Sequence, residues 1–500
     1  MPLPILNDRP FEDASVDTSV ETAETLMDED LQPNSTIAPI TASQFNAERR
    51  SQYLQTLLTI AQSSEVRCAE MAGSGVSLVQ QQAAARLREL AIPDPREEDW
   101  RFTNLSGLVE TPLCHPYPHC LLPTRSDLLP ILLADVPHRL VFVNGIYAPE
   151  LSSLDRLPPG ITVSNASGLV GQSARHLGQL PGSEEVFTTL NTAGFEDVAV
   201  ISLAPGTTLE EPLHVIFVST SGSQPSFSQP RCLVVAEARS RLTLVEDYIT
   251  IGDGCMYGSA NGVYFTNAVT EIWLGEEAHL HHSRLQRDSS GAFHIGKTTV
   301  HQSRQSRYTN VSLLLGAKLC RHNLEIYHQG EGVETVLQGL ALVTGEQVAD
   351  THSSILYKYP HGTSDQLYKA IVDGRGRSIF NGRVFVPQAA QWTNAAQLNR
   401  NLLLSAKARV DTKPQLEIVA DNVKCSHGAT VSQLEEDEIF YLQSRGIDRH
   451  SARDLLLDAF AREIINKIPV SSLRDTLSRC VACRTMPYSI IPSLVSFPIG

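Results

Sequence analysis

Residues 411–446 read DTKPQLEIVADNVKCSHGATVSQLEEDEIFYLQSRG, and the pattern of the chain changes from strand to helix within them. The stretch begins with a short apolar strand, Leu416–Val419, and continues through KCSHG. Cys425 and His427 are two positions apart, so on an extended backbone both side chains point to the same side. A thiolate and an imidazole on one side form half of a site for a soft metal ion. Gly428 beside them would let a partner or ligand approach the backbone closely.

A purely structural interpretation fits the same residues. Cys425 would then be a buried thiol, His427 a hydrogen-bonded side chain and Gly428 the residue that allows a strand-to-helix corner. The spacing alone favours neither interpretation.

Upstream of this stretch, residues 198–431 carry short runs rich in Val, Ile, Leu and Thr, with Gly, Asn or Asp between them. The runs include LHVIFV, RLTLVEDYI, KLCRHNLEIY, TVLQGLALV and ARVDTKPQLEIV. Many short strands without intervening helices are typical of a sandwich, a barrel or a solenoid. Small residues before several runs (Gly275, Gly316, Ala408) favour a solenoid with tight corners. A parallel β-helix needs caps on its terminal coils, and we expect helical regions at both ends to provide them.

Residues 432–500 are predicted to form the C-terminal helical domain and tail. Ser432-Gln433-Leu434-Glu435 has the sequence of a capping box, which predicts a helix start there, and Gly446 is placed to end that helix. Asp448 can cap a second helix, and Ser472 lies near the start of a third. The apolar stripe expected on the second helix consists of Ala452, Leu455, Leu456, Ala459, Phe460, Ile464 and Ile468.

The first 197 residues divide into two parts. Residues 1–45 carry nine acidic residues against the single Arg9 and few large apolar ones, which predicts an acidic disordered tail. Residues 46–197 are predicted to be a helical and mixed region, with helices over 46–62 and 76–91; the apolar face of the second includes Leu78 and Val79. The run REEDWRFTNL (96–105) has no explanation from its pattern.

The composition narrows the functional classes. A net charge of −15 argues against binding to a nucleic acid backbone. No apolar run is long enough to span a membrane, and the N-terminus lacks the layout of a signal peptide. Nine cysteines, scattered along the chain, are typical of free thiols in a reducing compartment. We therefore expect a cytoplasmic protein.

Other motifs are weaker candidates. Gly291–Thr298 matches the letters of a phosphate-binding loop, but the sequence after it is typical of a strand rather than a helix. Cys114–Cys120 contains four potential zinc ligands in one proline-rich loop that could hardly wrap around one ion, so we expect a surface loop. Cys480 and Cys483 form a lone CxxC. His279, His281 and His282 lie on a predicted strand, where a polar ladder is the default expectation.

Long segments of the chain resemble the SufB/SufD family of iron–sulfur cluster assembly proteins. The segments are VDTKPQLEIVADNVKCSHGATVSQL, REEDWRFTNLSGL, THSSILYKYPHGTSDQLYKAIVDGRGRSIFNGRV, NAAQLNRNLLLSAKARVDTKPQ and EEDEIFYLQSRGIDRHSARDLLLDAFAREII. The likeness runs from about Arg96 to Pro469. The stretch Leu398–Ser405 lacks the cysteine expected of the SufB branch, so the chain resembles the SufD branch.

This resemblance implies a mainly β fold: a right-handed parallel β-helix core between an N-terminal mixed region and a C-terminal helical domain. It implies a heterodimer with a SufB-like paralogue through the β-helices, and docking of a SufC-like ABC ATPase on the C-terminal helices. A transient Fe–S cluster would be shared with the paralogue, with His427 as a metal ligand and Cys425 as a less certain one. No stably bound cofactor and no enzymatic activity are expected, and an isolated chain can homodimerise.

Two alternatives stay open at this stage. One is a β-helix enzyme of the lyase or acyltransferase type, although the repeats are too irregular for the latter. The other is a purely structural dimerisation subunit.

Overall fold

The computed structural model describes residues 42–63, 76–116, 122–154, 157–220, 222–251 and 262–485. The chain divides into two units, Met1–Phe45 and Asn46–Gly500. The expected disorder of residues 1–45 falls almost entirely outside the described residues. The proposed division of the chain at residues 45, 197 and 431 stays a prediction. The second unit is described below.

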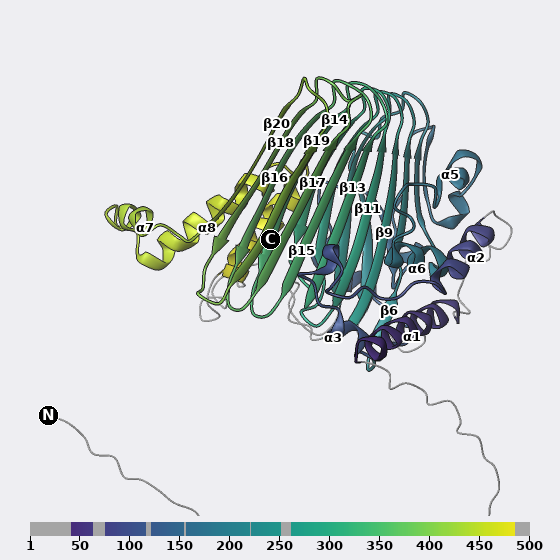
Figure 1. Ribbon diagram of the computed structural model, residues 1–500, viewed down its shortest axis with the longest axis horizontal. Helices are drawn as coiled ribbons and strands as arrows, with labels where there is room; N and C mark the ends of the chain where they lie inside the picture. The colour runs from purple at the N-terminus through teal and green to yellow at the C-terminus, as the bar shows by residue number, and fades with distance from the viewer. Residues whose placement is uncertain are drawn as a thin grey trace, which may run out of the picture. The chain divides into compact units, whose positions relative to one another are not determined.

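Two long sheets form the core of this unit, and their strands are parallel except for two antiparallel pairs (Figure 1). The first sheet consists, in spatial order, of β2 (Ile146–Tyr147), β1 (His138–Val143), β5 (Leu213–Thr220), β8 (Arg241–Ile251), β10 (His279–Arg287), β12 (Arg307–Leu314), β14 (Glu334–Val343), β16 (Thr363–Val372), β18 (Asn394–Leu403) and β20 (Lys424–Ser432). The second consists of β19 (Arg409–Ile418), β17 (Arg377–Val386), β15 (Val348–Tyr357), β13 (Leu319–His328), β11 (Phe293–Gln302), β9 (Tyr264–Leu274), β7 (Arg231–Ala236), β4 (Ala199–Leu203) and β3 (Ile161–Ser164), with β6 (Ser226–Ser228) beside β9. The antiparallel pairs are β1–β2 and β3–β4.

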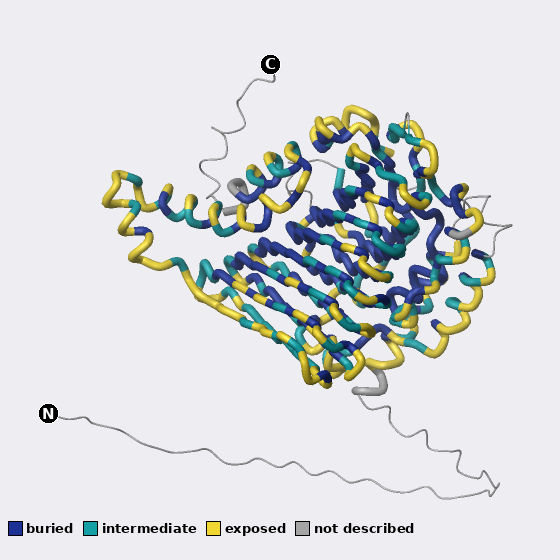
Figure 2. The backbone as a smooth tube through the Cα atoms, turned by 90° about the horizontal axis from the view of Figure 1, so that it is seen from above, coloured by how far each residue is buried: buried dark blue, intermediate teal, exposed yellow. Residues whose placement is uncertain are grey.

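From β8 onward the chain alternates between the two sheets, so each pair of successive strands completes one coil of a parallel β-helix. The expected β-helix is confirmed. Its interior is filled by alternate side chains of both sheets, including Leu244, Ile272, Leu324 and Ile355. Buried residues are continuous through the central coils (Figure 2).

The small residues before the strands do mark tight corners. A Cβ atom at Gly275 would lie 2.6 Å from the backbone nitrogen of Ala238, and one at Gly316 would lie 2.2 Å from the carbonyl oxygen of Asp288. Neighbouring coils therefore approach too closely at these corners for any side chain.

The N-terminal region packs on one face of the β-helix through helices and short strands. Its helical segments are α1 (Ala42–Gln62), α2 (Val76–Leu87), η2 (Glu98–Trp100), α3 (Ser106–Val109), α4 (Arg125–Leu128), η3 (Leu129–Ile131), η4 (Pro149–Leu151), η5 (Ala166–Gly168), α5 (Gly171–His176) and α6 (Val186–Gly194). Leu54 and Leu57 of α1 join Phe187 and Phe265 in one buried cluster. The expected burial of Leu78 is wrong, because it is 60 % exposed; the buried residues of α2 are Val76, Gln80 and Leu87.

The C-terminal part forms α7 (Glu436–Gln443), α8 (Arg449–Ile465) and α9 (Ser471–Thr485). The side chain of Asp448 accepts hydrogen bonds from the backbone N–H groups of His450 and Ser451, which confirms the predicted cap of α8. Gly446 has a φ of 85°, as expected for a residue that ends a helix. The predicted capping box is wrong, because Ser432 still belongs to β20 and the N-cap of α7 is Glu435.

The buried face of α8 agrees only in part with the expected stripe. Ala452, Ile464 and Ile468 are buried as expected, whereas Leu455 is 50 % exposed. The rest of the buried face consists of Leu457, Ala461 and Ile465. This face packs against outward-facing residues of the first sheet, including Leu340 and Ile371. The amine of Lys369 on β16 reinforces the contact by donating to the carbonyl oxygen of Phe460 at 2.8 Å.

The C-terminal helices therefore lie along the side of the β-helix, and the expectation that they cap its last coil is wrong. β19 and β20 are the last strands of the two sheets, and neither contains a buried residue. Figure 2 shows this coil as exposed or half-buried chain. Within the described residues, no helix is long and apolar enough to cross a membrane.

Candidate functional site

Cys425 and His427 lie on β20, the uncovered last strand of the first sheet. In the register of this sheet, Cys425 pairs with Ala395 and His427 with Gln397, and both partners are buried inward-facing residues of β18. Parallel neighbours in register point to the same side, so both side chains face the lumen of the β-helix. The same-side placement agrees with the spacing in the sequence. Among the described residues no further coil covers them, and His427 is exposed while Cys425 is half-buried against the core.

Cys425 and His427 differ in how easily each side chain can bind a metal ion. Partial burial raises the pKa of the Cys425 thiol, and a hydrogen bond with the backbone of Ala395 offsets only part of this rise. A thiol must lose its proton to bind a metal, whereas an exposed neutral imidazole needs no such step. The environment therefore favours His427 over Cys425 as the first ligand.

Within the described ranges, no group of three or more His, Cys, Asp or Glu side chains is placed to hold a metal ion. Cys425 and His427 amount to two potential ligands at an open end. A closed site on this strand needs ligands from outside the described residues.

The free edges of the last two strands differ. The N–H of Lys424 donates to the carbonyl oxygen of Thr393, the residue before β18. The alternate residues Cys425, His427, Ala429 and Val431 therefore direct their N–H groups away from the sheet. These four positions form an unblocked edge that can pair with another strand.

On β19, alternate residues also face the free edge, but one of them is a proline. The N–H of Arg409 donates to Gly376 and that of Val419 to Val386, so Pro414 lies at a position that faces the free edge. Proline has no N–H to offer a partner strand, which makes this edge the poorer one for pairing.

A buried polar network inside the β-helix was not predicted from the sequence. Glu246 accepts hydrogen bonds from Tyr248 at 2.6 Å and Thr270 at 2.5 Å, and its other oxygen lies 2.7 Å from Nε2 of His282. Burial by itself raises the pKa of Glu246, but His282 and Arg284 outweigh it and hold the pKa at about 2. The sequence did contain a signal: alternation along RLTLVEDYI places Glu246 on the same side as Leu244. Its oxygens already have partners, so the network is structural.

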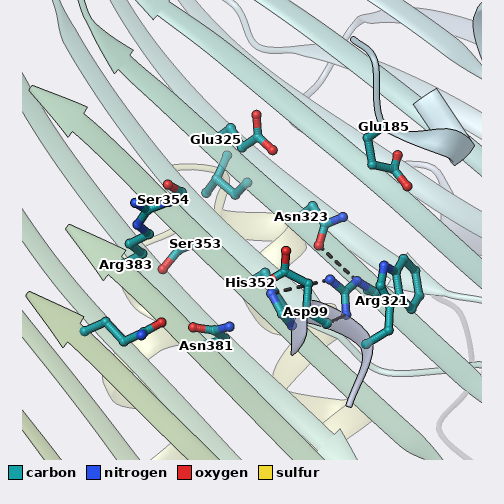
Figure 3. A pocket seen from close by; sticks show the side chains of 13 residues that line it. Asp99, Glu185, Arg321, Asn323, Glu325, His352, Ser353, Ser354, Asn381 and Arg383 are labelled. Atoms are coloured by element: carbon teal, nitrogen blue, oxygen red, sulfur yellow. Dashed lines mark hydrogen bonds between the residues drawn. The ribbon is translucent and has the colours of Figure 1, made fainter. Parts of the chain in front are cut away.

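A polar cleft of about 210 Å³ lies on the outer face of the second sheet (Figure 3). Arg321 forms its floor: Nη1 donates to Asp350 and to the carbonyl oxygen of Asp99, both at 2.7 Å. The guanidinium also lies 3.8 Å from the ring centre of Trp100. The hydroxyl of Thr103 donates to Asp350 at 2.5 Å.

These contacts explain the run REEDWRFTNL. Its residues fasten the N-terminal region to the outer face of the β-helix, and we call residues 96–105 the strap. Lys413 on β19 adds an exposed contact to Glu98 at 2.5 Å.

The remaining sequence candidates have structural roles or lie partly outside the described residues. Gly291–Thr298 leads into β11, where Lys297 pairs with Glu325, so the phosphate-loop interpretation is excluded. His115 lies 2.5 Å from Glu196, but residues 117–121 of the Cys114–Cys120 motif are not described. Cys480 is buried on α9, and the side chain of Cys483 is not described.

The three histidines of β10 divide between the two faces. His282 belongs to the interior network, and the ring of His279 accepts a hydrogen bond from Arg241 at 2.9 Å. Burial lowers the pKa of His281 to about 4, so it is neutral at physiological pH. None of the three is brought close to His427 by the strand register.

Comparison with known proteins agrees with this architecture. The family described as "SUF system FeS cluster assembly, SufBD core domain" matches residues 217–460. The chain is 47 % identical to an iron-sulfur cluster assembly SufBD family protein of Synechocystis over 81 % of this chain and 90 % of the relative. It is 34 % identical to the Arabidopsis thaliana protein ABCI7, chloroplastic (84 % and 88 % covered). It is also 31 % identical to the iron-sulfur cluster assembly protein SufD of Escherichia coli, over 81 % of this chain and 92 % of that protein. The chain belongs to the SufBD family of iron–sulfur cluster assembly proteins.

Proposed function

We propose that this chain is a non-enzymatic scaffold subunit of the SUF system. It supplies one side of a site on which a transient Fe–S cluster is built, and a SufB-like paralogue supplies the other side. The observation that carries the proposal is the exposed imidazole of His427 on a strand that has a free, unblocked edge. Imidazole is an accepted iron ligand, and a site with two ligands on one chain needs a second chain to close it.

The unblocked edge of β20 is the surface we assign to the paralogue. A strand of the partner that pairs with β20 would lie directly beside His427 and Cys425. Pairing would also bury the N–H groups of Cys425, His427, Ala429 and Val431, which supports heterodimer formation by strand addition. The same edge on a second copy of this chain would give a homodimer in the absence of the paralogue.

Replacement of His427 with alanine tests the ligand role. We expect cluster formation by the complex with the SufB-like and SufC-like subunits to fall about tenfold or more, because a ligand of the shared site is lost. Cluster formation is measured by absorbance and by acid-labile sulfide. His361 is an exposed histidine just before β16, two strands from β20 in the first sheet, so His361→Ala is the matched control. Wild-type rates for His427→Ala, or for the Cys425→Ala/His427→Ala double variant, would favour a purely structural subunit.

The C-terminal helices are the proposed dock for a SufC-like ABC ATPase. α7 projects beyond the last coil (Figure 1), with Phe440 69 % exposed and Tyr441 58 % exposed. Two exposed aromatic side chains on a short helix are typical of a partner surface. β20 ends at Ser432 and α7 begins at Glu436, so a motion of α7 is transmitted to the strand of His427.

Replacement of Phe440 with aspartate tests the dock. An aromatic anchor contributes about 2 kcal/mol or more, so we expect the Kd for the ATPase to increase about thirtyfold. Leu78→Asp is the control, since Leu78 is equally exposed on α2 but remote in the fold. Calorimetry with the purified ATPase measures both. Equal affinity of the Phe440→Asp chain and the wild type would reject this surface.

A further inference from the structure

Gln397 lies beneath His427 and has an unusual environment. The two residues are paired in the register of β18 and β20 and face the same lumen. Gln397 is only 2 % exposed. Its Nε2 donates to Oε1 of Gln366 at 3.4 Å, and that oxygen also accepts from the hydroxyl of Ser353 at 3.0 Å. These contacts hold one end of the Gln397 amide against Gln366.

The opposite sheet leaves space for this amide. A Cβ atom at Gly382 on β17 would lie 2.1 Å from Nε2 of Gln397. The φ of Gly382 is not positive, so its backbone conformation alone does not require glycine. The space is filled by the Gln397 amide, which reaches across the lumen at this level.

The other end of the amide has no partner. Within the described residues, Oε1 of Gln397 is buried and accepts no hydrogen bond. An unsatisfied buried acceptor costs about 1–3 kcal/mol, so such an oxygen indicates a donor that arrives later. His427 is the residue paired with Gln397 in register, and its ring carries an N–H group.

We propose that Gln397 is a positioning residue for His427. Its Oε1 accepts a hydrogen bond from one ring nitrogen of His427 when a partner covers the last coil, and the other nitrogen then faces the shared site. Histidines that bind metals usually donate their second ring N–H to a carbonyl or carboxylate oxygen, which fixes the tautomer and the ring orientation. This inference rests on the proposed ligand role of His427.

Three variants separate positioning from packing. Gln397→Met keeps the size of the side chain and removes the acceptor. Gly382→Ala displaces the amide while leaving Gln397 in place, although the ring of Phe380, whose Cζ would lie 2.8 Å from the added Cβ, must shift as well. Asn399→Leu is the matched control: Asn399 lies on the same strand and is equally buried, but it pairs in register with Ala429.

Two measurements are made on the full chain in complex with the SufB-like and SufC-like subunits. The first is the tautomer of His427, read from the ring ¹⁵N shifts of the cluster-free complex and assigned with His427→Ala. We expect one tautomer in the wild type and in Asn399→Leu, and a mixture in Gln397→Met and Gly382→Ala. The second is cluster formation, which we expect to fall about tenfold in the latter two variants only.

The outcomes distinguish the two proposals. An unchanged tautomer in Gln397→Met, or an equal change in Asn399→Leu, would overturn the positioning role even if His427→Ala blocks assembly. A tautomer that responds to Gln397→Met while His427→Ala assembles clusters normally would support positioning and reject the ligand role. If water is the only donor to Oε1 of Gln397, the tautomer of His427 will not change in Gln397→Met, and the positioning role is overturned.

Discussion

Replacing Arg321 with methionine is expected to lower the free energy of unfolding by about 3–5 kcal/mol. The change leaves the carboxylate of Asp350 fully buried without its guanidinium partner and removes the contact to the carbonyl oxygen of Asp99. It also uncovers the ring of Trp100, which holds the strap on the β-helix. Chemical denaturation followed by circular dichroism measures the loss.

The loss of unfolding free energy in Arg321→Met is expected to be larger at neutral pH than at acidic pH. Burial by itself raises the pKa of Asp350, but the charges of His352 and Arg321 and the hydrogen bonds from His352 and Thr103 hold it below its usual value. A carboxylate with a lowered pKa stabilises the fold above its unfolded pKa and loses this contribution as the pH falls through the folded value. In Arg321→Met the pKa of Asp350 rises, so the difference from the wild type is largest at neutral pH and shrinks as the pH falls from the raised pKa of the variant to the lowered pKa of the wild type.

Two further variants test the explanation. Arg383→Met removes an arginine that lines the same cleft, but its partner Glu417 is 42 % exposed, so we expect a loss below about 1 kcal/mol. Arg321→Met/Asp350→Asn removes the unpaired charge and is expected to recover part of the stability. Equal losses for Arg321→Met and Arg383→Met would contradict the role assigned to the buried pair.

Replacing Ala429 with proline is expected to weaken binding of the SufB-like paralogue on the order of 100-fold. The N–H of Ala429 faces the free edge of β20, so proline removes a donor that a partner strand needs and places a ring in its path. A partner carbonyl left without a donor costs about 1–3 kcal/mol, which corresponds to this change in Kd. Binding is measured with purified subunits by interferometry or calorimetry.

Thr412→Pro on β19 is the matched control. Its N–H also faces a free edge, but that edge is already interrupted by Pro414. We expect both chains to stay folded, since neither N–H belongs to a ladder within the sheets, and thermal unfolding checks this. If Thr412→Pro weakens binding as much as Ala429→Pro, the partner does not select the edge of β20.

The sequence was informative where structure depends on local pattern. Alternation in KCSHG placed Cys425 and His427 on one side, and Gly275 and Gly316 indicated the corners of the coils. Asp448 predicted the start of α8, because a cap depends on neighbours within three residues. The same local rule failed at Ser432, where pairing with Leu402 extends β20 and outweighs the capping sequence.

The rest depends on contacts between residues far apart in the chain. Packing against the first sheet decides which face of α8 is buried. The role of the strap depends on Arg321, which is more than 200 positions away in the chain. Gln397 could not be recognised as a neighbour of His427, because the length of one coil sets their register. The sequence by itself determined the β-helix and the pair of residues at its end, since both follow from periodicity and family resemblance. Only the tertiary structure decided that this end is open, because the placement of the C-terminal helices depends on which sheet face complements their apolar side.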